Sequence, residues 1–404
     1  MRSWVPVLFF LASACSVLSG CSQGSFELGA PQILEGPAPA GSMAPNLAVG
    51  LDERLYLSWI ESRAGGHALR FSTWSEGAWS PPRTVAAGDD WFVNWADFPS
   101  MAVLEDGTIA VHWLVKSGGE AYAYDVHVAL SHDGGVTWSE PVRPHDDGTK
   151  TEHGFVSLVA TAEGNFEILW LDGRNTGLTP HGPMTLRHAT LGVDGALTGE
   201  MLVDERVCDC CSTDALRTGD GATLVAYRDR SSSEVRDISV SRLSESKWST
   251  PRSVHDDNWE IAACPVNGPA LDSNGETVAI AWFTAAQGMP SVRLAFSTNG
   301  GRSFGPPVRI DEGRPYGRVD VVVADDGSAL VSWLEGSDDE ARILMRRAHP
   351  SGTSEPSLVA VTTGSRSSGV PRMVRFEDTI FVAWTEPTEL PRVRTATLSM
   401  SPGR

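Results

Sequence analysis

Seven short apolar segments, each ending in an aromatic residue, recur along the chain at nearly equal intervals. They are Leu55–Trp59, Ile109–Trp113, Phe166–Trp170, Leu224–Tyr227, Val278–Trp282, Leu330–Trp333 and Ile380–Trp384. The successive aromatic residues lie 54, 57, 57, 55, 51 and 51 residues apart. Self-similarity at such a period indicates a repeat architecture, because one unit alone cannot bury its apolar faces.

Each repeat contains the pattern of four short strands. The apolar segment follows a turn such as Glu105–Gly107, and another apolar strand precedes that turn. A third strand comes later, as at Val126–Leu130, and a fourth begins near a Trp-Ser-x-Pro sequence, as at Trp138–Pro141. Four strands in about 50 residues form one propeller blade. We therefore predict an all-β chain that folds as a single β-propeller of seven four-stranded blades, with all seven aromatic residues packed inside it.

The two ends of the chain indicate how the ring closes. The last repeat has only three strands and ends near Thr395–Met400, whereas an extra strand at Phe26–Glu35 precedes the first repeat. We expect this N-terminal strand to complete the last blade, which removes an exposed sheet edge. The expected organisation is a signal segment at 1–20, a short tether at 21–25 and the propeller at 26–404.

The N-terminal segment has the features of an export signal. Arg2 precedes the apolar run Trp4–Leu11, and Leu18–Cys21 follows. This sequence resembles the lipoprotein signals of bacteria, which implies lipidation of Cys21; an ordinary signal peptide is the alternative. The resemblance also implies outer-membrane sorting, because no Asp follows the cysteine. We expect a bacterial envelope protein that is lipid-anchored in the outer membrane and faces the periplasm or the cell surface.

The charge of the chain excludes one class of partner. Its formal net charge is −19 at neutral pH. Binding to nucleic acid needs clustered Lys and Arg, and we therefore expect no nucleic-acid partner. The same charge disfavours anionic lipid, so we expect membrane contact through the lipid anchor alone. We expect a monomer.

Two hairpins carry a recognisable sequence motif. Ser131–Trp138 reads Ser-x-Asp-x-Gly-x-Thr-Trp, and Ser297–Phe304 is a near copy with Asn in place of Asp. Ser72–Trp79 and Ser241–Trp248 are weaker copies. The motif resembles the Asp-box of the sialidase-like propeller family. This resemblance implies a propeller fold but not an activity, and sialidases of the family have six blades where seven are predicted here.

Cysteines meet at one level of the predicted ring. Counting eleven residues back from the turn of each blade gives His153, Cys210, Cys264 and Tyr316 in four consecutive blades, and Cys208 and Cys211 flank Cys210. Four cysteines in an exported protein can form two disulfides, and we favour a bond from Cys264 to Cys210 or Cys208. A copper or zinc site that includes His153 is the second interpretation, and reactive free thiols are the third.

Acidic pairs precede this level in five blades: Asp89–Asp90, Asp146–Asp147, Asp204–Glu205, Asp256–Asp257 and Asp311–Glu312. They are either turn residues or an acidic rim that attracts cations such as calcium.

The family resemblance also implies a catalytic set. Sialidases use a Tyr nucleophile activated by Glu, an Asp acid and arginines that hold the substrate carboxylate. The matching residue types here are Tyr316, Glu312 and Asp97. The ligand-binding candidates are Arg174, Arg228, Arg230, Arg318, Arg372 and Asn267. The chain departs from the family because no Arg-Ile-Pro stands in the first blade. Arg174 and Arg230 can instead form ion pairs with neighbouring aspartates.

From the sequence we therefore expect an anchored propeller that binds a glycan or a metal ion at the mouth of its central channel. The alternatives are an exo-sialidase or other glycoside hydrolase and a scaffold that binds another envelope protein.

Overall fold

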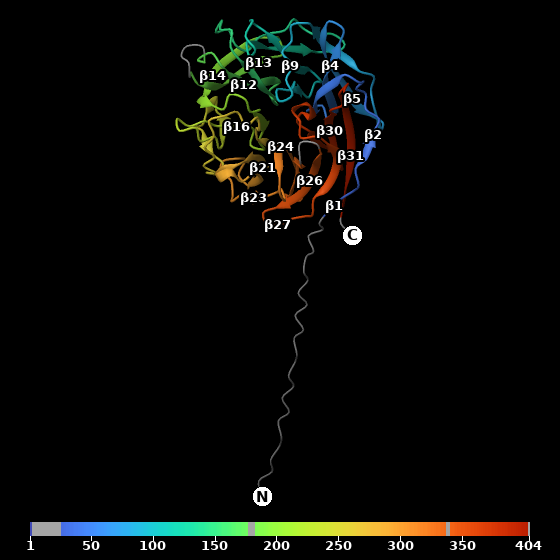
Figure 1. Ribbon diagram of the computed structural model, residues 1–404, viewed down its shortest axis with the longest axis vertical. Helices are drawn as coiled ribbons and strands as arrows, with labels where there is room; N and C mark the ends of the chain where they lie inside the picture. The colour runs from blue at the N-terminus through green and yellow to red at the C-terminus, as the bar shows by residue number, and fades with distance from the viewer. Residues whose placement is uncertain (2–25, 177–181, 337–339, 403–404) are drawn as a thin grey trace.

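The computed structural model describes residues 1, 26–176, 182–336 and 340–402, so Cys21 and the signal segment lie outside the described residues. Seven antiparallel sheets follow one another around a ring, and the colours of Figure 1 run once round it from blue to red. The predicted seven-bladed all-β propeller is confirmed. No helix in the described ranges is long and apolar enough to cross a membrane.

The strands of the first three blades have the following bounds. Blade 1 contains β3 (Ser42–Val49), β4 (Leu55–Arg63), β5 (Gly66–Ser75), β6 (Ala78–Trp79) and β7 (Arg83–Gly88). Blade 2 contains β8 (Met101–Val103), β9 (Ile109–Lys116) and β10 (Tyr124–Ser131). Blade 3 contains β11 (His153–Ala160), β12 (Asn165–Asp172), β13 (Met184–Gly192) and β14 (Leu197–Val207). In blade 2 the fourth strand is reduced to a bridge between Val128 and Val142.

The remaining blades repeat this order. Blade 4 contains β15 (Asp214–Arg217), β16 (Thr223–Arg228), β17 (Ile238–Ser244), β18 (Lys247–Trp248) and β19 (Arg252–Ser253). Blade 5 contains β20 (Ala270–Asn274), β21 (Thr277–Thr284), β22 (Ser291–Ser297) and β23 (Val308–Arg309), with a 3-10 turn η1 (Ala286–Gly288). Blade 6 contains β24 (Pro315–Val323), β25 (Ala329–Gly336), β26 (Ala341–His349), β27 (Gly352–Thr353) and β28 (Ser357–Thr362). Blade 7 follows the turn η2 (Arg366–Ser368) and contains β29 (Arg372–Phe376), β30 (Thr379–Glu386) and β31 (Arg392–Pro402).

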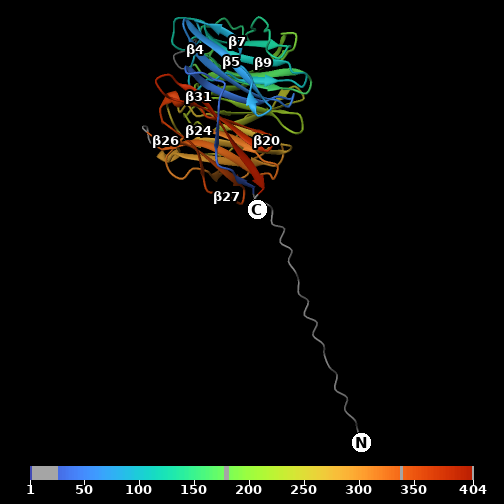
Figure 2. The same ribbon diagram turned by 90° about the vertical axis from the view of Figure 1, so that its right-hand side faces the viewer.

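The N-terminal strand closes the ring as predicted. Both β1 (Phe26–Leu28) and β2 (Gln32–Leu34) pair antiparallel with β31, and Leu34 lies opposite Thr395. The start of β1 therefore lies beside the C-terminal end of the chain (Figure 1). In the view from the side, β5 and β31 both lie on the part of the ring that faces the viewer (Figure 2). The two ends of the chain thus share one blade, which leaves no gap between the first and last repeats.

All seven repeat aromatics are packing residues, as predicted. Their side chains are buried: Trp59, Trp113, Trp170, Tyr227, Trp282, Trp333 and Trp384. Four of them also donate to a carboxylate of the same or a neighbouring loop, as in Tyr227 Oη to Asp204 Oδ2 (2.6 Å) and Trp282 Nε1 to Asp257 Oδ2 (2.7 Å). A buried polar group must be hydrogen-bonded, so these carboxylates allow an amphipathic aromatic ring to occupy the core.

Carboxylates on the inner strands tie consecutive blades together. Asp214 accepts a hydrogen bond from the backbone N–H of Leu271 (2.8 Å) in the next blade. Asp320 makes the same contact with Met373 (2.7 Å). These residues line one end of the central channel, in a cavity of about 480 Å³. Side-chain hydrogen bonds therefore join the inner strands of neighbouring blades, in addition to the packing between the blades.

The Asp-box forms the turn that its sequence predicts. The carboxylate of Asp133 accepts hydrogen bonds from the N–H groups of Val136 (3.0 Å) and Thr137 (2.9 Å). Gly134 and Gly135 have φ values of 69° and 82°, which side chains rarely adopt. The ring of Trp138 then packs edge-on against Phe71 of the preceding blade. The motif is structural, because every contact of the Asp133 carboxylate serves the turn.

Candidate functional site at the channel mouth

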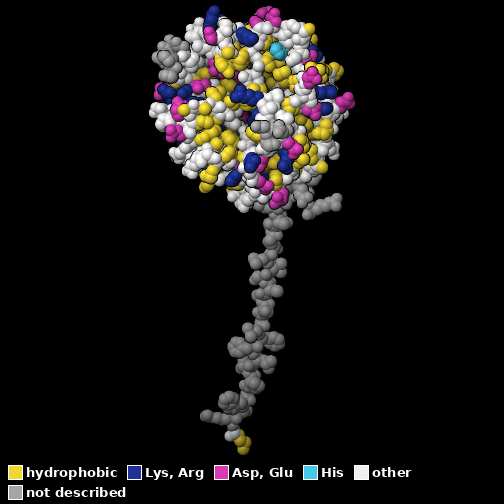
Figure 3. Space-filling view, viewed as in Figure 1, with side chains coloured by type: hydrophobic (Ala, Val, Ile, Leu, Met, Phe, Trp, Pro, Cys, Tyr) yellow, Lys and Arg dark blue, Asp and Glu magenta, His cyan; other side chains and the backbone are white. Residues whose placement is uncertain are grey.

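The loop between blades 1 and 2 lies across the mouth of the channel. Trp95 in this loop lies beneath the guanidinium of Arg318 from blade 6, at 4.6 Å. Phe98 lies beneath Arg372 from blade 7, at 5.1 Å. Lys and Arg side chains gather at the centre of the face seen in Figure 3. This loop therefore supplies aromatic rings to two arginines of blades 6 and 7.

Arg318 and Asn267 hold this region together. Arg318 donates to the carbonyl oxygens of Ser365 (2.9 Å) and Gly369 (3.1 Å), and burial lowers its pKa to about 10. Asn267 Oδ1 accepts the backbone N–H of Arg318 (2.7 Å), whose φ is 51°. Both residues were predicted to bind a ligand, and both are engaged with the chain itself.

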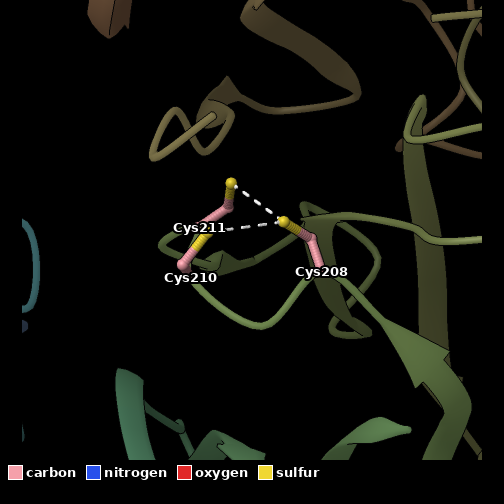
Figure 4. A group of neighbouring side chains, drawn as sticks. All are labelled: Cys208, Cys210 and Cys211. Carbon is pink, nitrogen blue, oxygen red and sulfur yellow. Dashed lines mark hydrogen bonds between the residues drawn. The ribbon is translucent and has the colours of Figure 1, made fainter. Parts of the chain in front are cut away.

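The four cysteines of the propeller converge at the same mouth. Cys208, Cys210 and Cys211 lie in the turn before β15, and Cys264 lies in the loop before β20. The Sγ of Cys208 is 3.3 Å from that of Cys211 and 3.9 Å from that of Cys210 (Figure 4). Cys264 comes from the next blade junction, and its thiol and that of Cys210 shift each other's pKa, upward for Cys210 and downward for Cys264. Two blade junctions thus supply one group of sulfur atoms, which we call the cysteine cluster.

The cysteine cluster differs in burial and charge from one thiol to the next. Cys208 and Cys211 are buried, Cys210 is half-buried and Cys264 is exposed. Hydrogen bonds from the thiols of Cys210 and Cys211 hold the pKa of Cys208 well below its ordinary value. The same contact with Cys208 raises the pKa of Cys210. All four are free thiols here, so the predicted disulfide between blades stays a prediction.

Two buried arginines support the cluster. Arg236 Nη1 donates to the Sγ of Cys208 (3.2 Å), and the positive charge of Arg228 also lowers the pKa of that thiol. Arg228 donates to three carbonyl oxygens, among them that of Asn267 (2.9 Å). Its own carbonyl accepts the backbone N–H of Cys208 (2.9 Å). Arg228 was predicted to bind a ligand, and in the structure it holds the two cysteine loops together.

His153, predicted to join the cysteines in a copper or zinc site, lies with Asp125 and His145 and with Asp147 and Asp172 instead of in the cysteine cluster. Its ring is fully buried and stacks on His145 with 3.8 Å between centroids. Its Nε2 lies 3.1 Å from Asp147 Oδ2, and its Nδ1 lies 3.7 Å from Asp125 Oδ1. Because the two imidazole planes are parallel, a single ion cannot lie in the plane of both rings at bonding distance. We therefore interpret the pair as a structural network.

Asp97 takes part in a different carboxylate group from the one predicted with Tyr316 and Glu312. Its two oxygens accept the N–H of Phe155 (2.9 and 3.0 Å) and the hydroxyl of Tyr124 (3.4 Å). The same hydroxyl donates to Glu152 (2.7 Å). Burial raises the pKa of Asp97 to about 7 and that of Glu152 to about 8. Glu312 instead pairs with Arg346.

The remaining arginine candidates form ion pairs. Arg174 pairs with its neighbour Asp172 (2.7 Å), as the local alternative predicted. Arg230 pairs with Glu234 (2.7 Å) and Asp209 (3.2 Å) rather than with Asp229. Arg372 lies 3.4 Å from Asp320. The role of these three arginines in ligand binding stays a prediction.

Three of the acidic pairs have one residue that is used inside the protein. Asp204 and Asp257 accept from core aromatics, and Asp311 accepts the N–H of Val292 (2.7 Å) and pairs with Arg309 (2.6 Å). These contacts match the turn interpretation. A calcium site at the rim stays a prediction.

The comparisons with known proteins concern the fold. No protein-family model matches the chain, and no curated protein matches it. Among solved structures, the polysaccharide lyase Uly1 superposes with a TM-score of 0.51, at 8% identity, over 91% of this chain and 91% of that one. A leech intramolecular trans-sialidase gives a TM-score of 0.49 at 10% identity, over 86% and 83% of the two chains. An α-L-arabinanase of Penicillium chrysogenum gives 0.49 at 11% identity, over 93% and 99%. The seven-sheet ring and the Asp-box turn identify the fold of this chain as a seven-bladed β-propeller with Asp-box hairpins.

Proposed function

We propose that the protein binds a thiophilic metal ion, Cu(I) or Zn(II), through Cys208, Cys210, Cys211 and Cys264 at the channel mouth. The observation that carries the proposal is the group of three thiols in the turn before β15, to which Cys264 of the next blade junction adds a fourth that interacts with Cys210. The ligand atoms of Cys208, Cys210 and Cys211 all lie within 4.8 Å of one another. Thiolate donors are those that Cu(I) and Zn(II) prefer in proteins.

The spacing of the sulfur atoms fits such an ion. Two sulfur atoms that share a tetrahedral zinc at about 2.3 Å each lie about 3.8 Å apart. The separation of Cys208 and Cys210 is 3.9 Å, and that of Cys208 and Cys211 is 3.3 Å. Both separations are therefore close to that of two thiolates that share one ion.

The surroundings supply charge compensation. A metal ion held by three or four thiolates leaves excess negative charge, which is costly in a buried site. Arg236 contacts Cys208 directly, and the charge of Arg228 acts on both Cys208 and Cys211. These two arginines favour deprotonated thiols, the form that binds metal.

The predicted lipid anchor would place this site at the envelope membrane. Lipidation of Cys21 remains part of the proposal, and its test is separate. We expect Cys21→Ala to release the protein into the soluble fraction. Metal binding by the released chain should not change, because Cys21 precedes the propeller.

Metal titration under reducing, anaerobic conditions tests the function. We expect the chelator-treated protein to bind about one ion per chain, measured by competition with a chromogenic ligand for Zn(II) and with bicinchoninate for Cu(I). Cys208→Ser should weaken binding by about 100-fold or more, since changes outside the ligand set alone cost about 10–100-fold. Ser212→Ala, next to the cluster but without a sulfur, is the matched control.

Two results would reject this function: no binding by the wild type, or equal affinity in Cys208→Ser and the control. Cobalt(II) separates the two ions, because a tetrahedral thiolate site gives intense visible absorption with cobalt. A site built for Cu(I) should bind cobalt weakly.

Glycan cleavage is the second candidate, and one contact favours it. Tyr124 donates to Glu152 at 2.7 Å beside Asp97, which are the residue types that the family resemblance implies. Tyr124 is only 1% exposed, so a glycan would reach its hydroxyl only after the neighbouring loop moved. A panel of fluorogenic sialosides and other glycosides tests this candidate. Turnover that Tyr124→Phe abolishes would support it, and a blank panel would remove it.

A further inference from the structure

The four thiols of the cysteine cluster form a graded series from solvent to core. Cys264 is exposed, Cys210 is half-buried, and Cys208 and Cys211 are buried. Ala262 and Ala263, which precede Cys264, are also exposed. An incoming sulfur atom therefore meets small side chains around Cys264 and reaches the other three thiols only through the protein.

The thiols of this series follow one another in space. Cys210 lies 3.9 Å from Cys208, and Cys208 lies 3.3 Å from Cys211. Cys264, in the loop of the next blade junction, interacts with Cys210, since each of the two thiols shifts the pKa of the other. Exchange proceeds by attack of one sulfur on the next, so adjacent sulfur atoms allow a disulfide to move along the series. A metal site alone does not require one exposed thiol and two buried ones.

We propose that the metal-free, reduced cluster is a dithiol relay that reduces disulfides of an exported protein or peptide. Cys264 is the thiol that reacts with the partner, Cys210 resolves the mixed disulfide, and Cys208 with Cys211 forms the buried reservoir. The inference is independent of the proposed metal function, since it concerns the same thiols without an ion.

The steps balance in atoms and electrons. The thiolate of Cys264 attacks one sulfur of the partner disulfide, and the other partner sulfur leaves and takes up a proton. The thiol of Cys210 then loses its proton and attacks Cys264, which forms the Cys210–Cys264 disulfide and releases the second partner thiol. Attack of Cys208 on Cys210, followed by attack of Cys211 on Cys208, moves the disulfide to Cys208–Cys211 and restores the exposed dithiol. Each disulfide formed in the cluster supplies two electrons and two protons.

The test uses the full chain, reduced, freed of metal with a chelator and kept under argon. The probe is a synthetic peptide with one intramolecular disulfide, and the reaction is quenched with an alkylating reagent for disulfide mapping by mass spectrometry. We expect Cys210–Cys264 to appear first and Cys208–Cys211 later, with two peptide disulfides reduced per chain. Cys264→Ser should slow peptide reduction about tenfold or more, because access limits this exchange.

A second variant isolates the buried reservoir. Cys208→Ser should reduce one disulfide per chain instead of two, with the product fixed as Cys210–Cys264. Near-ultraviolet circular dichroism checks that each variant is folded. Wild-type rates in Cys264→Ser, or a first disulfide between Cys208 and Cys211, would overturn the relay. Metal titration of the same samples shows separately whether the cluster binds an ion.

Discussion

The Nε of Arg228 donates a hydrogen bond to the carbonyl oxygen of Asn267 at 2.9 Å, and this contact joins the two loops that carry the cysteines. Arg228 is 1% exposed, and each of its three guanidinium nitrogens donates to a carbonyl oxygen, including that of Phe283. The Cζ atom of Arg228 also lies 4.9 Å from the centre of the Trp259 ring, and this second contact helps to fix the side chain. The cysteine cluster therefore depends on an arginine that contributes no ligand atom.

Replacement of Arg228 by lysine tests this dependence. Lysine cannot reproduce three hydrogen bonds in a planar arrangement, and each bond from a charged donor contributes about 1.5–3 kcal/mol. We expect Arg228→Lys to lower the free energy of unfolding by about 3 kcal/mol, measured by urea denaturation. Arg302→Lys is the control, because that side chain is 53% exposed. Equal stability of the two variants would show that the Arg228 contacts do not hold the loops.

The conformation at the start of β24 gives a second prediction. Gly317 has a φ of 80°, and a Cβ there would lie 2.3 Å from Oδ1 of Asn267. Gly65 has nearly the same φ, 81°, but a Cβ there would meet nothing within 4 Å. Both Ala variants incur the backbone cost of about 1–2 kcal/mol, and overpacking adds roughly 1–3 kcal/mol at Gly317 alone.

Thermal and urea unfolding of the two variants side by side isolates the clash. We expect Gly317→Ala to be the less stable protein, with a weakened junction between blades 5 and 6. If the two alanine variants unfold together, Asn267 moves freely and does not brace this strand.

The fold follows from sequence because the repeat is periodic. Turn, apolar segment and aromatic recur in every blade. Trp333 packs with residues of its own blade and of the preceding one, such as Phe283, and Trp59 packs with Phe381 of blade 7, which precedes blade 1 in the ring. Closure was also predictable, since the outer edge of β31 stays unpaired unless the N-terminal strand covers it. A repeated sequence pattern of this kind predicts which strands are neighbours and which residues of a blade are buried.

The site was less predictable because it depends on contacts across the ring. Sequence spacing placed His153 level with Cys210, but the ring of His153 turns toward Asp147 and His145. Tyr124 and Glu152 were missed because they stand 28 residues apart with no shared motif. Arg236 was missed for the same reason, since only the folded chain brings it to Cys208. One sequence signal could have pointed to Glu152, because it directly precedes His153, which the spacing of the blades places at the channel mouth.

The pH dependence of stability gives the last prediction, through Asp97. Its side chain is 5% exposed, and burial raises its pKa to about 7. An unfolded aspartate titrates near pH 3.9, so the folded state holds this proton more tightly than the unfolded state. The stabilisation due to the proton is complete below about pH 4 and is lost as the pH rises to about 7.

We therefore expect Asp97→Asn to gain stability relative to the wild type between pH 4 and pH 7, by up to about 4 kcal/mol, and to hold that gain above pH 7. The amide oxygen still accepts the N–H of Phe155, so the junction between blades 2 and 3 stays intact. Removal of the charge also lowers the pKa of Glu152, which acts in the same direction. Asp133→Asn is the control, because hydrogen bonds from Thr137 hold the pKa of Asp133 well below this window. Urea denaturation at each pH measures the difference, and parallel curves for Asp97→Asn and the wild type would show that Asp97 is ionised throughout.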